Sequence, residues 1–188
     1  MCDTARPGLG PARGTAGTGR AEVPMRPRQA SKSHVVMTEI VLPEDTNQYG
    51  QVWGGRIMAL IDKAAAIAST RHCRTNVVTV AIESLAFKAP VKLAHILRLY
   101  ASVNAAFRTS MEVGVKVVSE DPLSGIPTHC CSAYVTMVSL DAAGRPAPVP
   151  PLAPSGPEGR RRQRDAVRRR NARSASGRHS PRRRPPGG

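Results

Sequence analysis

The sequence predicts an α+β domain in which one antiparallel β-sheet packs against one long α-helix. A single apolar, alanine-rich segment runs from Gly54 to about Arg71, long enough for about five turns of helix. After Asn76 the pattern changes to period-two alternation with many β-branched residues, and short turns separate the successive segments. Consecutive strands joined by short turns form antiparallel sheets, so the helix is expected to cover one face of such a sheet.

Each expected strand has its own pattern. Residues 34–42 (HVVMTEIVL) form a first strand that Pro43 ends, and a polar loop leads from it to the helix. Clusters of Pro, Gly and Asp mark the turns between the later strands. The four strands expected after the helix span residues 76–87, 94–106, 109–120 and 128–140.

Charge divides the chain into three parts. The formal net charge is +15, yet residues 34–152 hold 10 Lys and Arg against 9 Asp and Glu. We therefore predict one folded domain over 34–152, flanked by basic, disordered segments at 1–33 and 153–188, with a short helix over 158–173 as an alternative. We expect non-specific, salt-sensitive contact with polyanions through the C-terminal tail. No aromatic residues alternate with its arginines, which argues against specific single-strand recognition.

The cysteines indicate a reducing compartment. Four cysteines are present without a CxxC pair, which favours free thiols over a disulfide framework or a zinc site. No apolar run approaches the roughly 18 residues that a membrane span requires. We therefore expect a cytoplasmic protein without a membrane span and without a metal.

The segment from Asn47 to Asp62 contains the residues that indicate a chemical function. A polar loop ends in Gly54 and Gly55, where a ligand can approach backbone N–H groups at the positive end of the helix dipole. Asp62 follows about two helical turns later. A helix start that polarises a carbonyl, together with a carboxylate, predicts hydrolysis of an ester or thioester.

Simpler interpretations stay open for these residues. Asp62 alone is often a solvated helix charge, and Asn47 alone is often a turn residue. Gln51 supports either the loop or a substrate. His72 follows the apolar helix, where a cation suits the helix C-terminus, so structural capping is favoured over catalysis.

The segments LPEDTNQYGQVWGG, IMALIDKAAAIASTRHC, TNVVTVAIESLAFKAPV, TSMEVGVKV and YVTMVSLDAAGRPAPVPPL resemble the hot-dog-fold acyl-CoA thioesterases, particularly the brain-type cytosolic acyl-CoA hydrolases and their single-domain bacterial relatives. They span roughly residues 35–152. The resemblance implies a single hot-dog domain and hydrolysis of fatty acyl-CoA to free fatty acid and coenzyme A. No cofactor is implied, since coenzyme A is part of the substrate.

The resemblance also implies site residues. Asp62 becomes the catalytic carboxylate, acting as base or nucleophile, and Gly55 supplies the N–H that polarises the thioester. Asn47 corresponds to a catalytic Asn that lies across a homodimer interface from Asp62, in sites shared between subunits; dimers are expected to assemble further into trimers of dimers. The positions expected to bind substrate or coenzyme A are Gly54, Gln51, Arg71, His72, Thr109 and Ser110.

The sequence departs from the family pattern at Trp53, where many relatives have His or another aromatic, and at residues 92–95, which replace a common Gly-Asp turn. Two rivals remain. A dehydratase of the same fold usually needs a catalytic His, and residues 44–62 contain none. A non-catalytic acyl-CoA-binding protein with a polyanion-binding tail would bind ligand without turnover.

Overall fold

The computed structural model describes residues 25–177, so the disorder predicted for 1–24 and 178–188 lies outside the described residues. Within this range the chain forms one short β-pair, one five-stranded sheet and two long helices. In chain order the elements are β1 (Arg28–Gln29), the 3₁₀ helix η1 (Ala30–Ser33), β2 (Val35–Ile40), the 3₁₀ helix η2 (Pro43–Asp45), α1 (Gly54–Cys73), β3 (Asn76–Phe87), β4 (Ile96–Ala106), β5 (Ser110–Glu120), β6 (Pro127–Leu140), β7 (Leu152–Ala153) and α2 (Gly156–Gly177).

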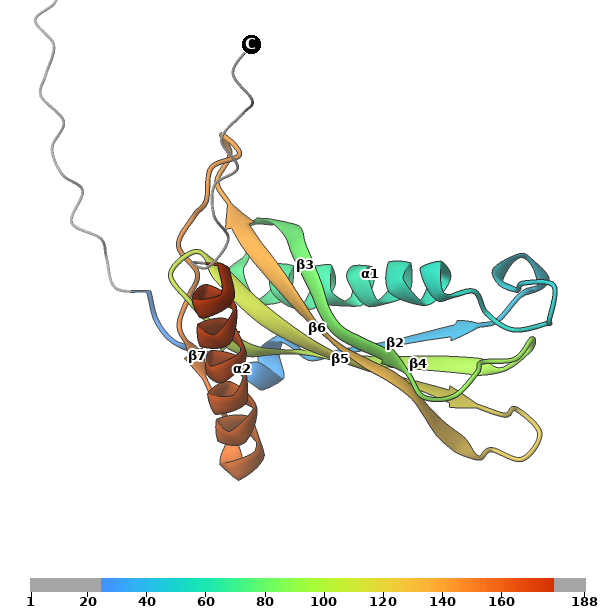
Figure 1. Cartoon of the computed structure of the whole chain (residues 1–188). Coiled ribbons are helices and arrows are strands. Elements are labelled where there is room, and N and C mark those ends of the chain that lie inside the picture. Colours follow the sequence, from blue (N-terminus) through green and yellow to red (C-terminus); the bar gives the residue numbers. More distant parts are fainter. Residues whose placement is uncertain (1–24, 178–188) are drawn as a thin grey trace, which may run out of the picture.

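The main sheet has the strand order β2-β4-β5-β6-β3, and every neighbouring pair is antiparallel. Helix α1 lies along one face of this sheet (Figure 1). The predicted fold class is confirmed, and so are the five predicted strands. Strand β4 begins two residues later than expected because the preceding turn places Ala94 in the left-handed region, with φ 64°.

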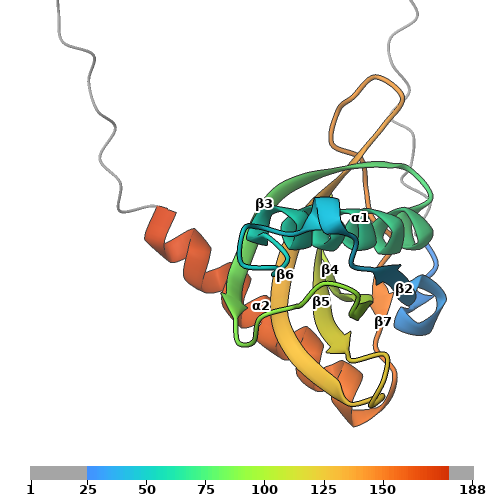
Figure 2. The ribbon, with the colours of Figure 1, turned by 90° about the vertical axis from the view of Figure 1, so that its right-hand side faces the viewer.

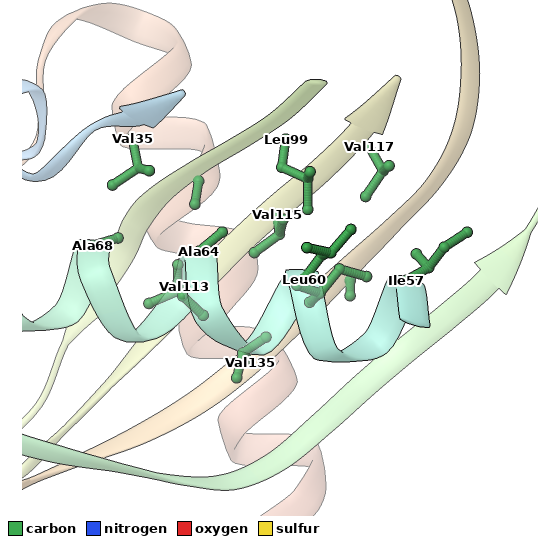
Figure 3. Close-up of a cluster of buried hydrophobic side chains, with 14 of the residues drawn as sticks. Val35, Ile57, Leu60, Ala64, Ala68, Leu99, Val113, Val115, Val117 and Val135 are labelled. Carbon is green, nitrogen blue, oxygen red and sulfur yellow. The ribbon is translucent and has the colours of Figure 1, made fainter. Parts of the chain in front are cut away.

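The core forms where α1 meets the sheet. Leu60, Ala64 and Ala68 recur at a spacing of four residues and are buried on the helix face that points at the strands. Figure 3 shows these side chains against alternate residues of β4, β5 and β6. Small alanines let the sheet backbone approach the helix closely. The strand residues that Figure 3 labels on this face are Leu99, Val113, Val115, Val117 and Val135.

Strand β3 forms one edge of the sheet. It has 12 residues, and most of its side chains are exposed or only partly buried. Val78 and Val80 are 43% and 62% exposed. A long strand edge with exposed apolar side chains is a template for pairing with another chain.

The structure corrects the prediction for the flanking segments. Residues 153–188 were expected to be disordered, but α2 occupies Gly156–Gly177 and is longer than the alternative helix over 158–173. Residues 25–33 also contain structure, because β1 pairs in parallel with β7. None of the helices within residues 25–177 combines the length and apolar character that crossing a membrane requires.

Helix α2 is held by an acidic residue that lies far away in the sequence. It packs on the sheet face opposite α1 (Figure 2), where Ala166 is fully buried. Arg169 donates to both carboxylate oxygens of Glu112 on β5, at 2.6 and 3.1 Å, and its guanidinium lies 3.5 Å from the centre of the Tyr134 ring. Asn104 donates to Glu112 at 3.2 Å. Glu112 is only 1% exposed, so Arg169 neutralises a buried charge.

We predict that Arg169→Ala destabilises the protein by about 3 kcal/mol, because removing one partner leaves a buried carboxylate uncompensated. Thermal unfolding, with limited proteolysis to monitor α2, measures the effect. Arg160→Ala is the matched control. The Arg160 side chain is exposed, so the free energy of unfolding of this variant should stay within about 0.5 kcal/mol of the wild-type value. Equal stabilities for the two variants would contradict the role given to Arg169.

Candidate active site

The loop before α1 is fixed to the first turn of the helix by an ion pair. The carboxylate of Asp45 lies 2.7 Å from Nε of Arg56 and also accepts a bond from the Leu42 N–H at 3.3 Å. Asp45 is buried, at 9% exposure, whereas the side chain of Arg56 is 32% exposed. The sequence analysis singled out neither residue, although together they set the position of the loop that carries Asn47.

Asn47 organises this loop. Its side-chain oxygen accepts bonds from the Tyr49 N–H at 3.0 Å and the Gln51 N–H at 3.2 Å, and its own N–H donates to the Gln51 carbonyl at 2.8 Å. The turn interpretation is therefore correct as a local description. The side-chain amide group of Asn47 has no partner among residues 25–177, so a hydrogen-bond donor remains available for a ligand.

The two glycines at the start of α1 differ in their surroundings. A Cβ on Gly55 would lie 1.9 Å from the ring of Trp53, whereas one on Gly54 would lie 3.4 Å from the ring of Phe87. A side chain at position 55 would therefore have to displace the indole of Trp53, which is 49% exposed. A hollow of about 360 Å³ opens beside this helix start, and its lining includes Gln51, Gly54 and Phe87.

Asp62 lies on the side of α1 that faces the edge strand β3. Thr79 donates its hydroxyl hydrogen to Oδ1 of Asp62 at 2.5 Å, and the same hydroxyl lies 3.2 Å from the sulfur of Met137. A bulge between Thr79 and Ala81 interrupts the β3–β6 register, which turns the local backbone. The second oxygen of Asp62 has no hydrogen-bond partner among the described residues. Asp62 is thus an oriented carboxylate with one oxygen free.

Sequence analysis missed Thr79. A threonine within a strand is common, and Thr79 comes 17 positions after Asp62, beyond the helix end and a turn. Neither helical nor strand periodicity relates two such positions. The contact exists only because β3 returns alongside α1.

The helix start and Asp62 are separated along α1. Asp62 comes seven positions after Gly55, a rise of about 10 Å, and no hydrogen bond within residues 25–177 joins Asn47 to Asp62. Gln51, Gly54, Gly55 and Asn47 gather at the helix start, whereas Asp62 stands two turns further on.

The other expected coenzyme A contacts lie at the opposite end of α1. Arg71 donates to the His34 carbonyl at 2.9 Å. Thr109 is in the turn before β5, and Ser110 pairs with Val138, close to the strand end that follows α1. No hydrogen bond or strand pairing within residues 25–177 joins Arg71 to Thr109 or Ser110, or any of the three to Asp62.

His72 is enclosed at the same end of α1. It is 1% exposed, and its Nε2 lies 2.9 Å from the Pro150 carbonyl. Burial lowers the pKa of His72, and the charge of Arg28 acts in the same direction. The imidazole is buried and bonded to the backbone, which fits a structural role, but its lowered pKa does not fit the cation expected at the helix C-terminus. The expected contact of His72 with coenzyme A stays a prediction.

Within the described part of the chain, neither a metal-binding cluster nor a reactive cysteine offers an alternative catalytic centre. Within residues 25–177, no cluster of three His, Cys, Asp or Glu side chains could hold a metal ion. Cys73, Cys130 and Cys131 are free and buried. Burial raises the pKa of the Cys131 thiol to about 12, so it stays protonated at neutral pH and is a poor nucleophile.

Comparison with known proteins identifies the family. Residues 49–126 match the model of the thioesterase superfamily. An uncharacterised acyl-CoA thioester hydrolase of Bacillus subtilis is 37% identical over 81% of this chain and 89% of its own length. The chain belongs to the thioesterase superfamily.

Solved structures of this superfamily share the fold. An apo-hexameric acyl-CoA thioesterase is 35% identical, covering 83% of this chain and 100% of its own, with a TM-score of 0.79. An acyl-CoA hydrolase of Staphylococcus aureus, solved with butyryl-coenzyme A and coenzyme A, is 32% identical over 80% of this chain and 94% of its own, with a TM-score of 0.73. That enzyme has also been solved with an Asn, an Asp or a Thr replaced by Ala; the Asp lies 15 residues after the Asn and 17 before the Thr.

We predict that Gly55→Ala displaces the Trp53 indole, because the new methyl group would occupy the space of the ring. Trp53 is the only tryptophan in the chain, so intrinsic fluorescence reports its environment directly. Gly54→Ala is the control, since its Cβ would meet Phe87 at an ordinary contact distance and should leave the emission unchanged. Identical spectra for Gly55→Ala and wild type would contradict this packing.

Proposed function

We propose that this chain hydrolyses fatty acyl-CoA thioesters to free acid and coenzyme A, with Asp62 as the catalytic carboxylate. The oriented Asp62–Thr79 pair is the observation that carries the proposal. The relatives named above as acyl-CoA hydrolases support the substrate class. Among them, the Staphylococcus aureus enzyme has Asn, Asp and Thr at the same spacing as Asn47, Asp62 and Thr79.

Thr79 acts as the positioning residue for the carboxylate. Because its hydroxyl binds Oδ1, the other oxygen of Asp62 is directed to one side. That oxygen either removes a proton from the attacking water or itself attacks the thioester carbon. Both routes pass through a tetrahedral oxyanion and release the coenzyme A thiolate; in the second route water then hydrolyses the anhydride formed on Asp62, which releases the free acid and restores the carboxylate.

The start of α1 supplies the oxyanion site. The N–H of Gly55 has no backbone partner among residues 25–177, as is usual for the first turn of a helix. The helix dipole adds positive potential at this point. The hollow beside Gln51 and Gly54 has room for the thioester and the first part of the acyl chain.

A complete site requires two chains. An oxyanion donor and a base must both lie within about 3 Å of the groups they act on. The rise of about 10 Å between Gly55 and Asp62 prevents one chain from placing both on a single carbonyl. We therefore propose a homodimer in which Asn47 and Gly55 of one subunit face Asp62 of the other.

Strand β3 offers the interface. Thr79 near one end of β3 contacts Asp62, and Phe87 at the other end lies beside Gly54. If two β3 strands pair antiparallel about Glu83, Thr79 of one chain comes opposite Phe87 of the other. Asp62 then lies near the partner's helix start. The exposed Val78 and Val80 would be covered in such a dimer. Assembly into a trimer of dimers stays a prediction.

We predict that Asp62→Asn lowers kcat at least about 10³-fold for every acyl-CoA tested, because the amide is neither base nor nucleophile. Thr79→Val, which keeps shape but removes the hydroxyl, should lower kcat about 10- to 100-fold, whereas Thr79→Ser should retain most activity. Thiol release from short-, medium- and long-chain acyl-CoAs measures all three. Full activity in Asp62→Asn would remove this carboxylate from the mechanism.

We also predict complementation between two inactive variants. Asn47→Asp keeps the oxygen that caps the loop but removes the amide donor. If sites are shared, a heterodimer of Asn47→Asp and Asp62→Asn contains one intact site. Random mixing of subunits by denaturation and refolding should then restore about a quarter of wild-type activity. Sites contained within single chains would give no recovery above the unmixed variants.

A further inference from the structure

Glu83 lies in the edge strand β3, on the sheet face that α2 covers. In the strand register it is opposite Tyr134 of β6, and the Tyr134 ring contacts Arg169 of α2. Arg173 follows Arg169 by one helical turn and donates to Oε2 of Glu83 at 2.5 Å. One face of α2 therefore binds both an inner strand and the open edge of the sheet.

The two ion pairs of α2 differ in burial. Glu112, the partner of Arg169, is 1% exposed and belongs to the interior of one chain. The side chains of Arg173 and Glu83 are 35% and 22% exposed, and their pair lies at the edge of the sheet. A partly exposed ion pair contributes little to the stability of one chain. The stability of a single chain therefore gives little reason for the Arg173–Glu83 pair.

The proposed dimer places Glu83 on its symmetry axis. When two β3 strands pair antiparallel about Glu83, this residue comes opposite its own copy in the other chain. Side chains directly opposite each other in an antiparallel pair have Cβ atoms about 4.5 to 5.5 Å apart and point to the same face. Two carboxylates at that separation repel each other. A Glu83 without a neutralising partner would therefore oppose the pairing of the two edges.

We propose that Arg173 enables two β3 edges to pair, because it neutralises Glu83 at the symmetry axis. Two Glu83 and two Arg173 side chains then form a cluster without net charge, and the end of α2 becomes part of the interface with a second copy of the chain. This inference rests on the proposed shared-site dimer, since a chain that stays unpaired has an incomplete site. Helix α2 thus controls a site that it does not touch.

The test is a double-mutant cycle on the full chain. Arg173→Gln leaves two carboxylates facing each other at the axis, whereas Glu83→Gln/Arg173→Gln removes both charges and the repulsion with them. Arg164→Gln is the matched control, because it removes the same charge from an exposed position on α2. We expect the dimer dissociation constant to rise at least about tenfold in Arg173→Gln. It should stay within about threefold of the wild-type value in the double variant and in the control.

Sedimentation over a dilution series measures this dissociation constant. Where the dimer persists at the lowest concentration, subunit exchange between two fluorescently labelled preparations measures the dissociation rate, which should rise by the same factor. Activity provides a second readout. Because the sites are shared, the activity per chain of Arg173→Gln should fall on dilution at concentrations where the wild type and the double variant keep theirs.

The position of the axis has its own test. A cysteine that lies opposite its own copy is within disulfide distance, so Glu83→Cys should form a bond between two chains on mild oxidation. Ser124→Cys, in the exposed turn between β5 and β6, is the control and should form no such bond. A dimeric Glu83→Cys variant that forms no more cross-link than the control would place the axis elsewhere and overturn the inference.

The mutant cycle can also overturn it. A wild type that stays monomeric, or an Arg173→Gln variant that dissociates no more than the wild type, means that Arg173 does not enable pairing. A loss of the dimer that Glu83→Gln does not reverse means that Arg173 acts only by anchoring α2. An equal loss in Arg164→Gln means that the net charge of α2 decides assembly.

The proposed function fails in a different way. A protein that hydrolyses no acyl-CoA, yet shows the expected pattern of dissociation, would refute the hydrolase and retain the role of Arg173. Hydrolysis that depends on Asp62, with assembly insensitive to Arg173→Gln, would do the reverse.

Discussion

The burial of α1 against one sheet face places every part of the candidate site. Ala64, Ala65 and Ala68 are fully buried on this face, so the strands approach the helix closely. Strand β3 then returns along the side of α1 and brings Thr79 to Asp62. The same packing directs the helix start toward the hollow at Gln51 and Gly54, and the helix end toward Arg28. Larger side chains at the alanine positions would separate these groups.

The distance between Gly55 and Asp62 along α1 is the reason for proposing a site shared between two chains. An α-helix of 20 residues keeps its first turn and its third turn about 10 Å apart, and no local rearrangement shortens that distance. Oxyanion stabilisation and base catalysis both act over single hydrogen bonds. The open edge of β3 would satisfy this requirement. Antiparallel pairing of two such edges would bring the start of α1 in one chain close to Asp62 of the other chain. Catalysis and assembly would then depend on the same surface.

The second face of the sheet is covered by a segment that composition alone suggests is disordered. Helix α2 contains eight arginines, and four of them contact specific groups outside the helix: Arg169 contacts Glu112, Arg173 contacts Glu83, Arg170 contacts the Phe107 ring and Arg162 contacts Ser102. Part of the tail's positive charge is therefore neutralised within the fold. Polyanion contact through the rest of the tail, like the cytoplasmic location, stays a prediction.

The sequence by itself determined the fold class, the order of the long strands, the position of α1 and the family resemblance. Hydrophobic periodicity and turn residues are local features, so they can be recognised in the sequence without knowledge of the tertiary structure. They also placed Asp62 and the glycine pair on α1. Only the tertiary structure decided that Thr79 holds Asp62, that His72 is enclosed and that Arg169 meets Glu112 across 57 residues. Each of these contacts joins segments that are distant in the sequence. Tertiary packing, and not a local sequence pattern, therefore brings the side chains together.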